Sequence, residues 1–430
     1  MAVSGRFVIL VALGVVPTVY FNDPAALGWW LLLVLAVSII DVVLAGSPRG
    51  LVFEREAPAA IRLGESASVR LLFTNTGRRA VRALVRDAWQ PSAVASPRTH
   101  SVTIPARERR AITTTLTPFR RGERRSHWVT VRSFGPLGVV ARQASIAVPG
   151  VLRVLPPFNS RKHLPSRLAR LRELDGATSV MVRGQGTEFD SLRDYVRGDD
   201  VRSIDWRATA RRKDLVVRTW RPERDRRVVI IVDSGRTAAA RIDNEPRLDT
   251  AFESALLLAA LATRAGDRVD LVIYDRRVRG RVQGATGPEL LNRMVNTMAT
   301  VEPELIEMDW NVVPGLVRSV TANRALVVIA TSIDAPGASR GLLAVLPQLT
   351  KKHLVVVSSV VDPDVLTTSR ERQNRDEVYL AAAAERALLD MARVSAAIRQ
   401  SGADVVTGSP AELPPALSDR YLALKAAGRL

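Results

Sequence analysis

The stretch RRVVIIVDSGRT, at residues 226–237, decides the fold of the carboxyl-terminal half of the chain. Its run of branched apolar residues, from Val228 to Val232, is typical of a parallel strand that is covered on both faces. A helical segment, Leu248 to Arg264, follows, and then a second apolar strand, DRVDLVIYD, at residues 267–275. This order of strand, helix and strand indicates a parallel sheet.

The alternation continues to the end of the chain, and it predicts a doubly wound α/β domain over residues 228–430. Beyond the second strand the sequence predicts, in order, a helix at Gly287–Thr300, strands at RALVVIATS (324–332) and HLVVVSSVVD (353–362), an Ala-rich helix across 375–400, a short strand ADVVTG (403–408) and a closing helix from Glu412.

Residues 51–150 have a different pattern, with short alternating runs that are separated by turn residues. Val69, Leu71 and Phe73 share one face of such a run, and Asn75-Thr76-Gly77 then forms a turn. Several runs of this kind predict an antiparallel, Ig-like β-sandwich over 51–150, and Pro149-Gly150 and Pro156-Pro157 are expected to punctuate its end. Residues 151–227 are polar and punctuated by glycine, and we expect an irregular segment there, in which Arg161 to Glu173 is a candidate for a basic amphipathic helix.

Two apolar stretches stand at the start of the chain, and residues 1–47 are expected to form a membrane hairpin. Helices at about 3–22 and 24–45 reach the roughly 20 residues that a spanning helix needs. A cleaved signal peptide is the alternative, but no clear cleavage site follows the first stretch. Arg6 precedes the pair and Arg49 and Arg55 follow it, so the positive-inside rule predicts a multi-pass protein of the cell membrane with both termini cytoplasmic.

The net charge of +19 is concentrated next to the expected hairpin. Residues 51–150 carry 17 basic and 6 acidic residues, and residues 151–227 carry 19 and 11. We expect an anionic inner leaflet to be the partner of this charge. Nucleic acid is the rival partner, but no DNA- or RNA-binding motif accompanies the arginines, and arginine-rich genomic composition is a third explanation. The absence of cysteine excludes disulfides and thiolate chemistry.

The turn after the first strand, DSGRT at 233–237, is a candidate ligand site because ligands bind at the carboxyl ends of parallel strands. It resembles the first loop of von Willebrand factor A-type domains, in which D-x-S-x-S binds a divalent cation. Asp233 and Thr237 match that pattern, and Asp334 corresponds to a third-loop acid. Gly235 replaces one hydroxyl, and Asp309-Trp310 stands where Gly-Thr is expected. The ligand count therefore favours a strand end without metal or other cofactor over a Mg²⁺ site.

The block at 184–227, with GTEFDSLRDYVRGDDVRSIDWRATARRKDLVVRTW at 186–220, resembles the hallmark block of the bacterial family of unknown function 58 (DUF 58). In that family a von Willebrand A-like domain follows the block and a membrane hairpin precedes it. The resemblance implies membrane proteins without established catalysis. Members are often encoded beside MoxR-type AAA+ ATPases, which implies work as an adaptor or assembly partner.

Acidic and basic residues alternate through this block, and two interpretations are open. Local ion pairs and hydrogen bonds would fix an irregular segment in place. A docking surface for a protein partner is the functional interpretation, since Trp, Tyr and Arg are enriched at interface hot spots. The candidate partner-binding residues are Arg193, Tyr195, Asp199, Asp200, Asp205, Trp206 and Arg207.

The search for catalytic patterns is negative. The four histidines lack metal-binding spacing, and no phosphate-binding loop is present. We therefore expect a membrane-anchored, cytoplasm-facing adaptor that is not an enzyme and that works with a MoxR-type AAA+ ATPase. A cation-dependent adhesion module that uses Asp233 is the alternative, and an enzyme of the cell envelope is a third hypothesis.

Overall fold

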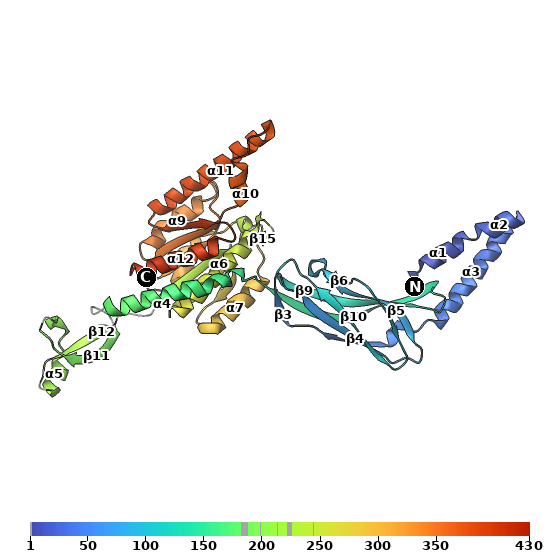
Figure 1. Ribbon diagram of the computed structural model, residues 1–430, viewed down its shortest axis with the longest axis horizontal. Coiled ribbons are helices and arrows are strands. Elements are labelled where there is room, and N and C mark those ends of the chain that lie inside the picture. Colours follow the sequence, from blue (N-terminus) through green and yellow to red (C-terminus); the bar gives the residue numbers. More distant parts are fainter. Residues whose placement is uncertain (1, 182–187, 198, 213, 222–225, 244) are drawn as a thin grey trace. The chain divides into compact units, whose positions relative to one another are not determined.

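The computed structural model describes residues 2–181, 188–197, 199–212, 214–221, 226–243 and 245–430. The chain divides into two compact units, Met1–Leu155 and Pro156–Leu430. The first unit contains the apolar helices and two mainly antiparallel sheets, and the second contains a mostly parallel sheet with its helices (Figure 1).

The apolar amino-terminal segment is helical but interrupted. It forms α1 (Gly5–Ala12), α2 (Val15–Phe21) and α3 (Ala25–Leu44). Among the described residues one segment, Ala25–Gly50, is long and apolar enough to cross a bilayer, with a mean hydropathy of 2.4. The segment Gly5–Phe21 would reach about 25 Å, which is short of the roughly 30 Å hydrocarbon core.

The prediction of two full-length membrane spans is therefore wrong for the first span, at about 3–22. Residues Ala2–Val3 form strand β1 and pair with strand β10 (Val140–Leu155), so Val3 does not begin a helix. Asn22 ends α2 in the left-handed conformation at φ 47°. The second expected span, 24–45, coincides with α3.

The predicted β-sandwich is confirmed. Two sheets, in the orders β1-β10-β9-β5-β7 (with β3 beside β10) and β2-β4-β8-β6, enclose two clusters of buried apolar side chains. Their strands are β2 (Leu51–Glu56), β3 (Ala60–Arg62), β4 (Ala67–Asn75), β5 (Val81–Trp89), β6 (Ala95–Ser96), β7 (His100–Ile104), β8 (Arg109–Leu116), β9 (Gly122–Phe134) and β10 (Val140–Leu155). The β3–β10 pair is parallel and the other pairs are antiparallel.

Strand β10 continues to Leu155 and does not end at Pro149-Gly150 as expected. The pairing of β10 with β9 shifts register between Ala147 and Gly150. Pro149 lies in this irregularity, where its missing N–H costs no ladder hydrogen bond. The proline therefore marks a bulge, and Pro156-Pro157 follow the true end of the strand.

Asp41, near the carboxyl end of α3, joins the helix to the sandwich. Its side chain is fully buried, and its carboxylate accepts hydrogen bonds from the backbone N–H groups of Leu137 (2.9 Å), Val139 (2.8 Å) and Val140 (3.1 Å). Gly135 lies so close to Asp41 that no Cβ would fit. A carboxylate that is costly in lipid is thus satisfied by the turn between β9 and β10.

The second unit is built on a six-stranded sheet in the order β17-β16-β13-β18-β19-β20. The β16–β17 pair is antiparallel and the other pairs are parallel. The strands are β13 (Arg227–Asp233), β16 (Arg268–Tyr274), β17 (Val278–Val282), β18 (Leu326–Ala330), β19 (Leu354–Val360) and β20 (Asp404–Gly408), and β14 (Arg241–Ile242) with β15 (Glu245–Pro246) forms a separate small pair.

Helices contact both faces of this sheet (Figure 1). Val229, Ile231 and Val327 point to one face, where residues of α8, α9 and α11 pack in one cluster. Helices α6 and α12 contact the strands elsewhere, and α12 packs along α6. The helices are α6 (Arg247–Arg264), α7 (Gly287–Thr300), α8 (Val313–Val320), α9 (Arg340–Thr350), α10 (Pro363–Thr368), α11 (Arg375–Gln400) and α12 (Leu413–Ala426).

The segment 151–227 contains a helix that overlaps the candidate at Arg161 to Glu173, and beyond it more regular structure than expected. Beyond β10 it forms helix α4 (Leu164–Met181), strands β11 (Glu188–Asp194) and β12 (Val216–Arg221), and the short helices η4 (Val201–Ser203) and α5 (Trp206–Arg212). Strands β11 and β12 pair antiparallel in a sheet of their own. We call residues 188–221 the hairpin arm.

Candidate functional site

Two neighbouring parallel strands end at the candidate site. Strand β13 ends at Asp233, strand β18 ends at Ala330, and the two strands are paired. The next strand of the sheet after β13, which is β16, lies on one side of this pair. The next strand after β18, which is β19, lies on the other side. Strand order reverses between them, which is the position where open α/β sheets place their ligand crevice.

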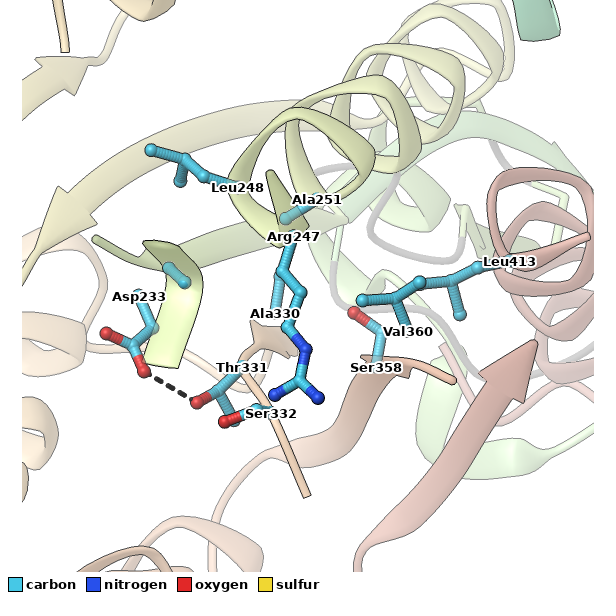
Figure 2. Close-up of a pocket in the computed structure, with 11 residues that line it drawn as sticks. Asp233, Arg247, Leu248, Ala251, Ala330, Thr331, Ser332, Ser358, Val360 and Leu413 are labelled. Carbon is cyan, nitrogen blue, oxygen red and sulfur yellow. Dashed lines mark hydrogen bonds between the residues drawn. The ribbon is translucent and has the colours of Figure 1, made fainter. Parts of the chain in front are cut away.

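Asp233 is held at this position by its own loop and by β18. The residue has 4% of its surface exposed, and its Oδ1 accepts from the N–H of Gly235 at 2.8 Å. Its Oδ2 accepts from Thr331 Oγ1 at 2.7 Å (Figure 2). Burial raises the pKa of Asp233, and the negative charge of Asp275 adds to this, while the hydroxyls of Thr331 and Thr237 and the Gly235 N–H oppose it.

A second buried carboxylate, Asp275, follows the next strand and was not singled out from the sequence. Burial alone would raise its pKa, but hydrogen bonds from Arg279 (2.6 Å) and from the N–H groups of Arg277 and Arg276 lower the pKa overall. Ser234 also donates to it at 3.2 Å. Asp275 ends the run DRVDLVIYD, so its place at a strand end was the signal that could have revealed it.

A cleft of about 480 Å³ opens above these strand ends. Asp334 lies in its wall, accepts a hydrogen bond from Ser332 at 2.8 Å, and pairs with Arg247 at 3.2 Å. Arg236 is exposed and pairs with Glu307 at 3.1 Å. The cleft is lined by Asp233, Arg236, Thr237, Glu307, Met308, Asp309, Trp310, Asn311, Thr331, Ser332, Asp334, Gly337, Ala338, Ser339, Gly341 and Leu342.

A small recess of about 20 Å³ adjoins the cleft, with which it shares Asp233, Thr331 and Ser332. The guanidinium of Arg247 points into it from α6, toward Ser332 and Ser358 (Figure 2). Ser358 Oγ and Arg247 Nε have no hydrogen-bond partner among the described residues. A recess of this volume has room for about one water molecule, which could serve both groups.

The residues present do not fit a divalent cation. The structure brings Asp233, Thr237 and Asp334 to one cleft, but Asp334 is already paired with Arg247. At Gly235, where the pattern calls for a hydroxyl, a Cβ would lie 2.8 Å from the backbone oxygen of Ile306. Among the described residues no group of three or more His, Cys, Asp or Glu could hold a metal ion.

Three acidic residues of the hairpin arm, Asp199, Asp200 and Asp205, are satisfied locally. Asp199 pairs with Arg193 at 2.6 Å and accepts from the N–H of Val196, and Asp200 caps the helix η4. Asp205 accepts from Arg218 at 2.8 Å and from two backbone N–H groups of α5. The hydrogen bond from Arg218 is the main cause that lowers the pKa of Asp205. These three carboxylates therefore hold the arm in shape.

Four apolar residues of the arm are exposed, while Val216 and Val217 are buried. Trp206 has 65% of its surface exposed, and Val196, Val201 and Leu215 have 62%, 61% and 44%. Arg207 is also exposed, while Tyr195 is half-buried and its N–H donates to the backbone oxygen of Leu215. The arm thus pairs three of its carboxylates locally and leaves four apolar side chains exposed.

Comparison with solved structures finds only partial likeness. The CARDB domain of the PF1109 protein from Pyrococcus furiosus is 18% identical and aligns with 24% of this chain and 91% of its own, with a TM-score of 0.18. A FixG-related protein from Vibrio parahaemolyticus is 8% identical and aligns with 24% of this chain and 96% of its own, also with a TM-score of 0.18.

Similar sequences occur in bacteria. The uncharacterized protein Rv1480 of Mycobacterium tuberculosis is 26% identical over 258 residues, which are 57% of this chain and 80% of that protein. The uncharacterized protein YeaD of Bacillus subtilis is 25% identical over 113 residues, 26% of this chain and 28% of that protein. Residues 191–401, which include most of the hairpin arm and the strand-end cleft, match the family described as "Protein of unknown function DUF58".

Proposed function

We propose that the protein is a membrane-anchored adaptor that binds a protein partner through the hairpin arm. The observation that carries this proposal is the exposure of Trp206, Val196 and Val201 on an arm in which three carboxylates already have local partners. Exposed apolar side chains with Trp and Arg among them are typical of interface hot spots. A solvated arm without a partner would not need this surface.

The partner we propose is a MoxR-type AAA+ ATPase, as the family resemblance implies, and the body of the protein faces the cytoplasm. The apolar segment Ala25–Gly50 supports the anchoring. Arg6 and Arg49 on either side of the helical hairpin support the orientation through the positive-inside rule.

The second unit is proposed to be a von Willebrand A-like domain. Numbered by chain position, its strands lie in the order 3-2-1-4-5-6, which is an order of doubly wound α/β folds. In this chain the strand-end loop is better suited to hold its own geometry than to bind a cation, because Arg247 occupies Asp334 and Gly235 has no space for a side chain. The adaptor proposal therefore does not depend on metal.

The test is affinity recovery of the ATPase from solubilised membranes with Trp206→Ala. Loss of a hot-spot tryptophan costs about 2 kcal/mol or more, or roughly thirtyfold in affinity. The matched control is Tyr379→Ala on α11, because Tyr379 is equally exposed at 65%. Equal recovery with both variants, or crosslinks from position 206 to lipid alone, would contradict the proposal. Circular dichroism checks that both variants remain folded.

A further inference from the structure

Four chain segments meet at the end of the sandwich to which α3 is joined, and we call this the hairpin end. They are the helix η1 (Pro48–Gly50) and the turns at 76–80, 105–108 and 135–139. Asn75, which is 1% exposed, links two of the turns, since its Nδ2 donates to the backbone oxygens of Arg79, Ile104 and Pro105. Thr76 donates to the backbone oxygen of Gly50, so a hydrogen bond also joins η1 to the turn at 76–80.

The hairpin end is also fixed to the apolar helices. Asp41 of α3 accepts from three N–H groups of the 135–139 turn and its flank, and Arg6 of α1 donates to the backbone oxygen of Leu137 at 2.9 Å. Arg79 donates to the backbone oxygen of Val43 at 2.8 Å. These hydrogen bonds therefore fix the position of the turns along the segment Ala25–Gly50, which is apolar enough to cross a bilayer.

The positive charges of the hairpin end have no carboxylate partner within the described residues. Arg49, Arg78 and Arg107 are exposed and form no ion pair there, and Arg6 and Arg79 donate to backbone oxygens. The acids nearby are engaged elsewhere: Glu108 pairs with Arg110 at 2.8 Å, and Asp41 is buried. Five guanidinium groups thus gather where few negative charges oppose them.

An apolar side chain lies among these arginines. Leu137, at the tip of the 135–139 turn, has 50% of its surface exposed. On α3 the exposed residues nearest this end are also apolar, with Val43 at 54% and Leu44 at 47%. From α3 toward the sandwich, the exposed surface is therefore first the apolar helix, then the exposed leucine and then the arginines. A bilayer offers the same order, from acyl chains to phosphates.

We propose that the hairpin end is a collar that binds the headgroups of anionic phospholipids. Arg49, Arg78, Arg79 and Arg107 contact the phosphates, and Leu137 lies at the boundary with the acyl chains. The inference rests on the membrane anchoring in the proposed function. It adds a lipid class and a site to that function.

The test uses full-length protein in phosphatidylcholine bilayers that contain spin-labelled phosphatidylglycerol or spin-labelled phosphatidylcholine. The motionally restricted fraction of each label gives the ratio of association constants for anionic over zwitterionic lipid. We expect a preference for phosphatidylglycerol that falls by about fivefold or more in the variant Arg49→Gln/Arg78→Gln/Arg107→Gln, since each arginine near the surface contributes about 1 kcal/mol. High salt should weaken the preference in the unmodified protein.

The control is Arg98→Gln/Arg120→Gln, which removes exposed arginines from the other end of the sandwich, where β6 pairs with the last residues of β8. An absent preference, or an equal fall in both variants, overturns the collar. Binding of duplex DNA at physiological salt that disappears in the triple variant also overturns it and assigns the charge to nucleic acid. Carbonate extraction separates the two proposals: a chain that leaves the bilayer contradicts the anchoring, and a retained chain without lipid preference contradicts the collar alone.

Discussion

Two buried aspartates at neighbouring strand ends have opposite electrostatic environments. Burial raises the pKa of Asp233 despite two hydroxyls and one N–H that donate to it, whereas the Arg279 guanidinium and two backbone N–H groups lower the pKa of Asp275. Between the pKa of the unfolded chain and the raised pKa, native Asp233 holds a proton that the unfolded chain has lost. Its contribution to stability is therefore present at low pH and is lost as pH rises through the folded-state pKa.

We predict that Asp233→Asn makes the free energy of unfolding of the second unit less dependent on pH. Relative to the unmodified protein, the variant should gain stability as pH rises from about 4 toward neutrality, by about 1.4 kcal/mol for each unit by which the pKa is raised. Asp275→Asn is the comparison, and it should destabilise the protein at neutral pH because buried donors lose their acceptor. Denaturant titrations at several pH values measure both. Parallel pH profiles for Asp233→Asn and the unmodified protein would contradict the assignment.

At the scale of elements, the junction between α3 and the sandwich depends on Asp41. In Asp41→Asn an amide NH₂ would face N–H groups that now donate to Oδ2. We predict a loss of about 1–3 kcal/mol for each N–H left unsatisfied. The rate of hydrogen–deuterium exchange at the amides of Leu137, Val139 and Val140 should then rise by up to about a hundredfold relative to the unmodified protein. Asp23→Asn is the control, since within the described part of the chain the exposed Asp23 carboxylate accepts one hydrogen bond, from the N–H of Ala25 at 2.8 Å. Unchanged exchange in the peptide that contains these amides would show that Asp41 does not hold the turn.

Elements were predictable from the sequence where all their residues lie in the same environment, such as the buried interior. The run from Val228 to Val232 is apolar because both faces of β13 are covered, and its pattern needs no other information. Pro149 was misread because a proline at a bulge and a proline at a strand end look alike in one sequence. The interruption near Gly14 was missed because hydropathy does not report where a helix breaks.

The sites were less predictable than the elements, because they depend on contacts between distant residues. Asp233 could be singled out from its place after an apolar run. Its partner Thr331 and the pairing of Asp334 with Arg247 join residues far apart in the chain, and no local pattern announces such pairs. For the same reason Asp41 reads as an isolated charge in an apolar helix until the turn that binds it is seen.

At the scale of the whole molecule, the charge distribution and the apolar segment together predict an orientation in the membrane. The chain contains no cysteine, so single cysteines report their location without background. In intact cells a membrane-impermeant maleimide should label Asp23→Cys, at the tip of the helical hairpin. Arg120→Cys and Tyr379→Cys, exposed positions of the sandwich and of α11, should be labelled only after lysis. Labelling of all three in intact cells would place the body outside, where a cytoplasmic ATPase could not reach the hairpin arm. Labelling of none before lysis would place Asp23 and the body on the same, inner side, so that Ala25–Gly50 would not cross the bilayer, which would contradict the anchoring by a span.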